Sequence, residues 1–256
     1  MIEKFNYIFN TIQKSNIEAL APNFLQLEKE FNLQYLRYIN IKRFTIPVIG
    51  RISSGKSTFL NAILGLNNIL ESNTDITTKF VCIIRHNQFI DKPKVYSVKL
   101  EERKEKQIIK NENSKPKFNF EKEEEIEGDI KEIIIKRNEY IKDTKKELLN
   151  KEDFFMIIET KIPIFNKDMI QYSEIFEFMD LPGLNEKEGD DSFFNKNILP
   201  VISNNTKFSF FIFDYSSIKD NDKFKVYESF IKLFDIQIEN CFYILNKIDF
   251  IDLSKK

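Results

Sequence analysis

The chain contains very little cysteine and histidine. Its two cysteines, Cys82 and Cys241, lie inside apolar strand-like runs, and so small a number excludes a disulfide framework or a zinc site. We expect each to be a buried free thiol. The only histidine, His86, ends another strand-like run and has no second histidine or cysteine pair near it. A structural or surface role is therefore expected for His86, rather than metal binding or general-base catalysis.

Long apolar runs are also missing, because no window of about 18 apolar residues occurs. Residues 1–6 do not form the basic and then apolar pattern of a signal peptide. We therefore expect a soluble cytoplasmic protein. The net charge of −1, from 39 basic and 40 acidic residues, gives no general attraction to nucleic acid or to anionic membranes. The 256 residues are 42% hydrophobic, which is enough for one large domain with a sizeable core.

One short run dominates the sequence. Residues Gly50–Ser57 read GRISSGKS and match the G-x-x-x-x-G-K-S pattern of a phosphate-binding loop. The apolar run Phe44–Ile49 precedes it as a strand, although Pro47 weakens that assignment, and a helical segment through Leu64 follows. A chance glycine-rich turn is the alternative, but the fixed spacing and the strand–loop–helix context argue against it.

The chemistry of this run follows from its residue types. Gly50 and Gly55 allow the backbone to turn tightly, so that successive N–H groups face an anion. The start of the helix at about Lys56 adds a partial positive charge. Lys56 would reach the β- and γ-phosphates, and the Ser57 hydroxyl would bind Mg²⁺. The run therefore predicts a nucleoside triphosphate site.

A second motif, Asp180-Leu181-Pro182-Gly183, follows the strand-like run that starts at Glu174. A carboxylate at a strand end can hold Mg²⁺ through its water shell. The backbone N–H of Gly183 can approach a γ-phosphate without a side chain in the way. An ordinary Asp-x-Pro-Gly turn is the alternative, and the buried strand before it makes that the weaker interpretation.

A third motif, Asn246-Lys247-Ile248-Asp249, ends the last apolar run. The Asp249 carboxylate can accept two hydrogen bonds from guanine, from N1–H and the exocyclic amine, and adenine offers no such pair. Asn246 can bond the purine edge or tie the phosphate loop, and the stem of Lys247 can lie on the base. This motif favours GTP over ATP and argues against an ATPase.

The polar segment before Lys79 contains three threonines, Thr74, Thr77 and Thr78. A threonine hydroxyl there would complete the Mg²⁺ shell when the γ-phosphate is present. Thr77 and Thr78 face opposite ways if the segment is extended, and we favour Thr78 without excluding Thr77.

The rest of the chain alternates between apolar strand-like runs and helical patterns. This alternation predicts an α/β fold, a three-layer P-loop sandwich with a mostly parallel central sheet covered on both faces. Ligands of such sheets bind at the C-terminal ends of the strands, where the motifs fall. The expected strands are Phe44–Ile49, Lys79–Arg85, Val95–Leu100, Phe154–Ile164, Glu174–Asp180, Phe208–Asp214 and Cys241–Asn246, and the expected helices are Thr58–Leu64, 192–203 and Asp222–Phe234.

Two segments stand apart from this alternation. Residues 1–43 carry an apolar stripe at helical spacing, so we expect helices that either pack on the domain or join a bundle. Residues 101–151 contain the charge runs Glu101–Lys106 and Glu121–Glu125, which predict a solvated, mobile insertion with one charged helix. A charged helix of this kind is more often a solvated face than a partner site.

Taken together, the motifs resemble those of the dynamin superfamily of large GTPases. The resemblance rests on SSGKSTFLNA at residues 53–62, Thr77-Thr78, DLPGL at Asp180–Leu184 and NKID at Asn246–Asp249, and it covers roughly residues 44–250. It implies a GTPase domain over residues 44–256 that is incomplete at its C-terminus, preceded by bundle-like helices. Self-association of GTPase domains across the nucleotide is also implied, and membrane remodelling, with peripheral attachment, rests on the analogy alone.

The resemblance further implies Mg²⁺-dependent GTP hydrolysis by direct attack of water, with catalytic roles for Ser53, Lys56 and Thr78 or Thr77. It assigns Ser54 and Thr58 to nucleotide binding together with the motif residues named above, and Ser57, Thr78 and Asp180 to the metal. One position departs from the pattern: Ile52 stands where classical dynamins have a glutamine that positions the attacking water. A GTP-binding scaffold with negligible turnover therefore remains the alternative function.

Overall fold

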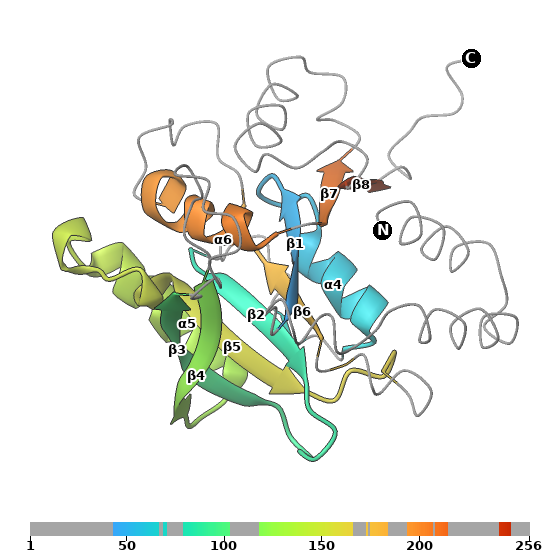
Figure 1. Cartoon of the computed structure of the whole chain (residues 1–256), viewed down its shortest axis with the longest axis horizontal. Helices are drawn as coiled ribbons and strands as arrows, with labels where there is room; N and C mark the ends of the chain where they lie inside the picture. Colours follow the sequence, from blue (N-terminus) through green and yellow to red (C-terminus); the bar gives the residue numbers. More distant parts are fainter. Residues whose placement is uncertain are drawn as a thin grey trace, which may run out of the picture.

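The computed structural model describes residues 43–66, 69–70, 79–102, 118–165, 173, 175–183, 194–206, 208–214 and 241–246. Figure 1 shows the chain with these elements coloured along the sequence. The helices expected in residues 1–43 and at Asp222–Phe234 lie outside the described residues, apart from Arg43. In the described part, no helix is long and apolar enough to cross a membrane.

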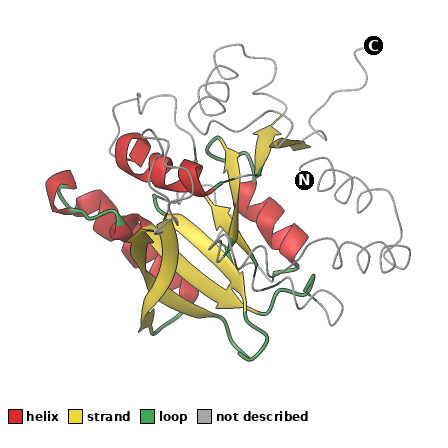
Figure 2. Cartoon of the chain, in the orientation of Figure 1, coloured by secondary structure: helices red, strands yellow, loops and turns green. Residues whose placement is uncertain are grey.

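An eight-stranded sheet forms the centre of the structure, with the order β4-β3-β5-β2-β6-β1-β7-β8 (Figure 2). Strands β6, β1, β7 and β8 run parallel to one another. Strand β2 is parallel to β5 but antiparallel to β6, and β3 is antiparallel to both β5 and β4. The strands are β1 (Phe44–Gly50), β2 (Val81–His86), β3 (Lys94–Glu102), β4 (Phe118–Ile126), β5 (Phe155–Thr160), β6 (Phe176–Asp180), β7 (Ser209–Asp214) and β8 (Cys241–Asn246).

The sheet is therefore mixed, and the expectation of a mostly parallel sheet holds only for the half that carries the motifs. Strand β2 explains the error, because Val81–Arg85 are all buried although β2 runs against β6. A continuous apolar run reports burial on both faces and carries no information about strand direction.

Helices cover both faces of the sheet. Helix α4 (Lys56–Leu64) and helix α5 (Ile130–Asp143) contribute side chains to one apolar core cluster. Helix α6 (Leu199–Asn205), which continues from a π-helical turn at Phe194–Ile198, contributes to the other. Short 3₁₀ turns occur at Lys146–Leu148 and Glu152–Phe154. The expected three layers are present around the mixed sheet.

Strand β1 is central and leads into the phosphate-loop sequence. It pairs with β6 from Phe44 to Val48 and with β7 from Val48 to Gly50. Pro47 lies inside this strand, and pairing with β7 begins at the residue after it. Because proline has no N–H to donate, a sheet interior tolerates it only where the ladder does not need that donor.

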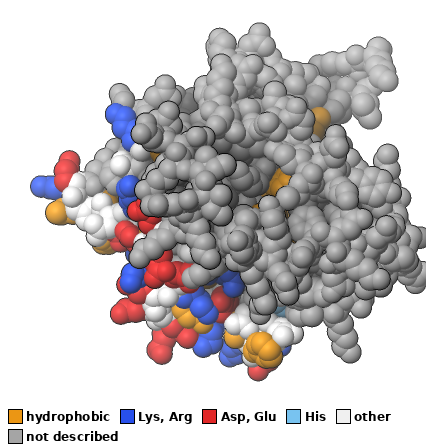
Figure 3. All heavy atoms as spheres, viewed as in Figure 1, with side chains coloured by type: hydrophobic (Ala, Val, Ile, Leu, Met, Phe, Trp, Pro, Cys, Tyr) orange, Lys and Arg blue, Asp and Glu red, His pale blue; other side chains and the backbone are white. Residues whose placement is uncertain are grey.

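The segment expected to be a mobile insertion is partly built into the sheet. Its acidic run lies in β4, which pairs antiparallel with β3 and forms one end of the sheet order. Charged side chains gather over β3 and β4 in Figure 3, and charge is a common protection for an edge strand. Helix α5 begins after Asp129, whose carboxylate accepts from the N–H groups of Lys131 and Glu132. It buries Ile133 and Ile134, so it is a core helix with one charged face.

Three smaller expectations can be compared with the structure. Cys82 and Cys241 are both free and buried, as expected. His86 accepts a hydrogen bond at Nδ1 from the backbone N–H of Ile162 (3.0 Å), and partial burial lowers its pKa, which agrees with a structural role. The apolar run Cys241–Asn246, which predicts a buried strand, forms β8 at one end of the sheet order and exposes Tyr243 and Leu245 by 47% and 44%.

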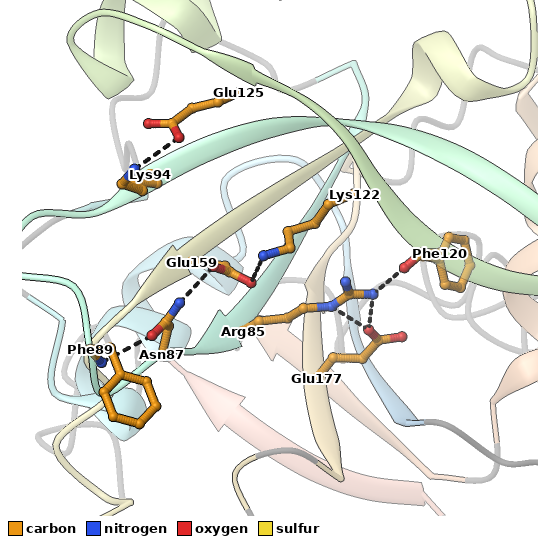
Figure 4. Close-up of polar contacts among 9 residues, drawn as sticks. All are labelled: Arg85, Asn87, Phe89, Lys94, Phe120, Lys122, Glu125, Glu159 and Glu177. Carbon is orange, nitrogen blue, oxygen red and sulfur yellow. Dashed lines mark hydrogen bonds and ion pairs between the residues drawn. The ribbon is translucent and has the colours of Figure 1, made fainter.

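A buried polar network joins four strands at the ends opposite the motifs, and Figure 4 shows its contacts among Arg85, Glu177 and Phe120. Arg85 on β2 donates through Nε (2.9 Å) and Nη2 (2.7 Å) to Glu177 Oε2 on β6, and Nη2 also donates to the carbonyl of Phe120 on β4. Thr45 on β1 donates to Glu177 Oε1 (2.7 Å). The side chains of Arg85 and Glu177 are only 5% and 2% exposed, so removing either one would leave the other as an uncompensated buried charge.

We expect Arg85→Met to lower the free energy of unfolding by about 3–5 kcal/mol, because it leaves the Glu177 charge buried without its partner. The double change Arg85→Met with Glu177→Gln should recover part of that loss, since glutamine is neutral and still accepts from Thr45. Urea unfolding of both variants measures this difference. A double variant as unstable as, or less stable than, the single one would show that the ion pair is not the source of the loss.

Candidate nucleotide site

The loop between β1 and α4 has the backbone shape that the phosphate-loop pattern predicts. The N–H of Ser54 donates to the carbonyl of Arg51 (3.1 Å), which closes a turn. Gly55 has φ of +96° and serves as the N-cap of α4, and Ser53 has φ of +59°. Left-handed residues in such a loop turn neighbouring N–H groups toward one point, which creates an anion-binding concavity.

Glycine is required at two places in this loop for steric reasons. A Cβ on Gly50 would lie 2.5 Å from Ser54 Oγ and 2.7 Å from the carbonyl oxygen of Ile212 on β7. A Cβ on Gly55 would collide with the side-chain amide of Asn246, and its positive φ is strained for any other residue. Both glycines of the pattern are therefore explained by close packing of the loop against β7 and β8.

The first turn of α4 meets the end of β6. Ser57 Oγ donates to Asp180 Oδ2 at 2.6 Å, although the two residues are 123 positions apart in the chain. Val48 on β1 is in register with Asp180, so the pairing of β1 with β6 brings the two motifs to one edge of the sheet. Lys56 is buried and its Nζ donates to the carbonyl of Arg51 (3.0 Å), across the loop.

The charges of Lys56 and Asp180 are incompletely compensated. Burial raises the pKa of the Asp180 carboxyl, and the charge of Lys56 and the Ser57 hydrogen bond offset only part of that effect. Burial likewise lowers the pKa of Lys56, with partial compensation from Asp180. Neutralising groups from outside the chain, a cation near Asp180 and an anion near Lys56, would stabilise both charged forms.

Two oxygens in this cluster suit a divalent cation. Asp180 Oδ1 is buried and has no hydrogen-bond partner among the described residues, and Ser57 Oγ lies next to the same carboxylate. Mg²⁺ prefers oxygen ligands and is commonly held by one or two protein groups together with phosphate oxygens and water. The described ranges contain no cluster of three or more His, Cys, Asp or Glu side chains that could hold a metal. The residues present therefore fit Mg²⁺ bound with a phosphate ligand.

Asn246, at the end of β8, and Gly183, in the turn after β6, also approach the phosphate loop. Asn246, at the end of β8, donates through Nδ2 to the carbonyl of Ser54 (2.9 Å), so it makes the loop contact that was one of its two expected roles. A Cβ on Gly183 would lie 2.6 Å from Ile52 Cγ1 and 2.7 Å from Ile52 Cα. The turn after β6 thus packs directly on the loop, and Ile52 is 37% exposed at that contact.

The structure brings most of the predicted residues to one edge of the sheet. Residues 50–58, Asp180, Gly183 and Asn246 lie on or beside the loop, with Ser54 fully buried and Thr58 exposed. Thr77, Thr78, Lys247 and Asp249 fall outside the described residues, so their assignments remain predictions.

Sequence reasoning gave no role to two buried asparagines that contact the neighbours of the threonine segment. Asn61 hydrogen-bonds Leu70, and Asn138 accepts from the N–H of Lys79. Their only signal in the sequence is a side-chain amide on the face of a helix that otherwise carries apolar residues.

Comparison with known proteins gives one family. The sequence profile described as "Dynamin family" matches residues 46–248, which is most of the chain. A solved structure from an oligomerised bacterial dynamin pair, studied for long-range sensing and tethering of membranes, is similar at 20% identity and a TM-score of 0.41. The match covers 90% of this chain and 29% of the length of that dynamin. None of the curated proteins matches.

Gly50→Ala should weaken GTP binding at least about tenfold, because its Cβ would push against the backbone of Ile212 and displace the loop. Calorimetric titration with GTP measures the affinity. The control is Gly128→Ala in the turn before α5, where a φ of +135° strains alanine but the nearest atoms to its Cβ are 3.8 Å away. Equal losses of affinity in both variants would contradict a local effect on the loop.

Proposed function

The chain belongs to the dynamin family, and from that premise we propose that it binds GTP together with Mg²⁺ and hydrolyses the β–γ phosphoanhydride bond. The observation that carries this proposal is the cluster of Lys56, Ser57 and Asp180 at the phosphate loop. Asp180 Oδ1 is buried and has no hydrogen-bond partner within the described ranges, which favours a cation, and the buried Lys56 ammonium favours phosphate.

In the proposed complex, the backbone N–H groups of Gly50–Lys56 hold the phosphates. The Lys56 ammonium exchanges its present acceptor, the Arg51 carbonyl, for β- and γ-phosphate oxygens. Ser57 would hold Mg²⁺ as a ligand and Asp180 would hold it directly or through water, and a threonine of the 71–78 segment, preferably Thr78, would complete the site. Bound Mg²⁺ supplies positive charge against the developing negative charge of the phosphates.

Catalysis by these residues would consist of positioning and charge stabilisation, with no covalent enzyme intermediate. The loop is held between β1 and α4, so little reorganisation of its donors would be needed when charge moves toward the leaving diphosphate. We propose that the N–H of Gly183, which packs against Ile52 of the loop, faces the γ-phosphate, and that Ser53 is the partner of the attacking water or of a charge-compensating cation. Water is the nucleophile, and the products are GDP and inorganic phosphate.

Guanine selection is proposed for Lys247 and Asp249, which follow β8 directly. The parallel ladder between β7 and β8 ends with Asp214 opposite Asn246, and Asn246 bonds the loop carbonyl of Ser54. Asn246, which precedes Lys247 in the sequence, therefore lies beside the phosphate loop, and this supports the proposed base-contacting role. Self-association across the nucleotide and peripheral membrane attachment are further proposals that rest on membership in the dynamin family alone.

A second candidate, a GTP-binding scaffold with negligible turnover, is favoured by one specific contact. Ile52 occupies the surface of the loop against Gly183, where the turn after β6 would approach the γ-phosphate. An apolar side chain there cannot hydrogen-bond an attacking water. The two candidates share the binding site and differ only in turnover.

The hydrolysis proposal is tested by phosphate release from GTP at high protein concentration. Lys56→Ala should abolish turnover above background, because its buried ammonium already lies across the loop, 3.0 Å from the carbonyl of Arg51, where we propose that the phosphates bind. Lys94→Ala is the control, since Lys94 is exposed on β3 in an ion pair with Glu125 and should leave turnover unchanged. Wild-type turnover no higher than that of Lys56→Ala would exclude the enzyme and leave the scaffold.

Ile52→Gln distinguishes a slow enzyme from one already at full rate. Glutamine supplies a polar group at the loop surface, so we expect kcat to rise at least about tenfold, with the affinity for GDP unchanged. Single-turnover hydrolysis and GDP titration measure the two quantities. Ile52→Leu, which keeps the apolar character at similar volume, serves as the control, and an equal kcat for the two variants would show that Ile52 does not limit turnover.

A further inference from the structure

Within the sheet, Asp180 lies between two side chains that supply no strong hydrogen-bond donor. Val48 on β1 is in parallel register with it, and Cys82 on β2 is its antiparallel partner, since β6 lies between β2 and β1 (Figure 1). Val48 and Cys82 are buried, with 0% and 2% of their surface exposed. Valine has no side-chain donor, and a thiol is only a weak one. The strong donor to the carboxylate therefore comes from outside the sheet, from the Ser57 hydroxyl on α4.

The Cys82 thiol lies on the same face of the sheet as the Asp180 carboxylate. Directly opposed residues of an antiparallel pair project to one face, with Cβ atoms about 4.5–5.5 Å apart. Cys82 belongs to the apolar cluster to which α4 contributes Leu60, and Ser57 of the same helix bonds Asp180. Burial, to which the charge of Asp180 adds, raises the pKa of the thiol well above its usual range, so the neighbour of the carboxylate is a neutral, weakly polar group.

This neighbourhood leaves one carboxylate oxygen unsatisfied. Ser57 donates to Oδ2, whereas Oδ1 is buried and has no hydrogen-bond partner among the described residues, the Cys82 thiol included. Asp180 as a whole is 3% exposed, so bulk water does not replace the missing donor. A buried oxygen without a donor costs stability, and the residue at position 82 does not relieve that cost.

We propose that Cys82 is a positioning residue of the proposed metal site: because its side chain offers no strong donor, Asp180 Oδ1 stays available to Mg²⁺ or to a water bound to Mg²⁺. The inference rests on the proposed function and gives a role in it to β2, a strand that carries none of the motifs. A cation and a hydrogen-bond donor compete for the lone pairs of the same oxygen. The unsatisfied oxygen also makes the metal-free site less stable, which increases the gain in free energy when a cation binds.

The variant Cys82→Ser tests this competition, because it places a strong donor beside Asp180 with little change in volume. In the metal-free protein the new hydroxyl should donate to Oδ1. We therefore expect Cys82→Ser to unfold at a higher urea concentration than Cys82→Ala, which removes the sulfur and adds no donor. This comparison needs neither nucleotide nor metal.

The response to Mg²⁺ should rank the two variants in the opposite order. Calorimetric titration of the full chain with GDP, once with excess Mg²⁺ and once with EDTA, gives two dissociation constants, and their ratio reports the coupling between Mg²⁺ and GDP. We expect Cys82→Ser to reduce this ratio about tenfold, because its hydroxyl competes with the cation. Cys82→Ala should reduce it less than about twofold, and GDP binding in EDTA should stay unchanged in both variants.

The other buried cysteine provides a matched control. Cys241→Ser makes the same chemical change on β8, where the thiol lies 4.0 Å from Ser209 Oγ and not beside a carboxylate. Cys241 begins β8, at the end of the strand away from Asn246 and the phosphate loop, so this variant should keep the wild-type ratio. Equal reductions in Cys241→Ser and Cys82→Ser would overturn the proposal, and so would a reduction in Cys82→Ala as large as that in Cys82→Ser.

A purely structural role for Cys82 would lower stability and the Mg²⁺ response together, whereas the proposal requires the two quantities to rank Cys82→Ser and Cys82→Ala oppositely. A serine variant that is no more stable than the alanine variant without metal overturns the proposal. If the wild-type chain binds no GDP, or binds it equally well with and without Mg²⁺, the proposed function fails, and the role of Cys82 fails with it. If the wild type responds to Mg²⁺ and Cys82→Ser keeps the full response, only the role of Cys82 is excluded.

Discussion

The site depends on one contact, the hydrogen bond from Ser57 Oγ to Asp180 Oδ2. It joins the first turn of α4 to the end of β6, and nothing in the local sequence of either motif produces it. The contact exists because β1 pairs in parallel with β6 in a register that sets Val48 beside Asp180, two residues before the loop begins. The parallel half of the sheet is thus the part that assembles the chemistry, since parallel strands deliver their C-terminal ends to one edge.

The other half of the sheet stabilises this arrangement from the opposite edge. Arg85 and Glu177 extend the antiparallel pairing of β2 with β6 by one charged pair, and Thr45 and the carbonyl of Phe120 complete the hydrogen bonds of that pair. A buried pair of this kind adds little net stability over an apolar replacement, but it disfavours any register that separates the charges. Glu177 lies three residues before Asp180 on β6. A slip of β6 would therefore both separate the Arg85–Glu177 pair and break the hydrogen bond from Ser57 to Asp180.

The sequence predicted those parts of the fold and the candidate site that depend on local motifs, and it missed those that depend on contacts between distant residues. The phosphate loop, Asp180 and Asn246 were found because each motif has fixed residue types at fixed spacing, and the structure places them at one edge. The direction of β2 was missed because burial on both faces looks the same in parallel and antiparallel strands. Residues 118–126 were taken for a mobile stretch because charge predicts solvation, whereas on an edge strand charge is compatible with backbone pairing. Asn138 was missed because its partner is a backbone N–H 59 residues away, which no local pattern records.

The antiparallel pairing of β2 with β6 also affects the environment of Asp180. Because β2 lies against β6, the Cys82 side chain is next to Asp180, and burial together with the Asp180 charge holds the pKa of the Cys82 thiol well above its usual range. A neutral thiol adds no charge to balance the carboxylate and excludes water from it. Asp180 is then left with Lys56 and the Ser57 hydroxyl as its described compensating groups, which do not fully offset its burial. A solvated carboxylate in the same place would need less compensation, so the mixed topology increases the effect of a neutralising cation near Asp180, as in the proposed metal site.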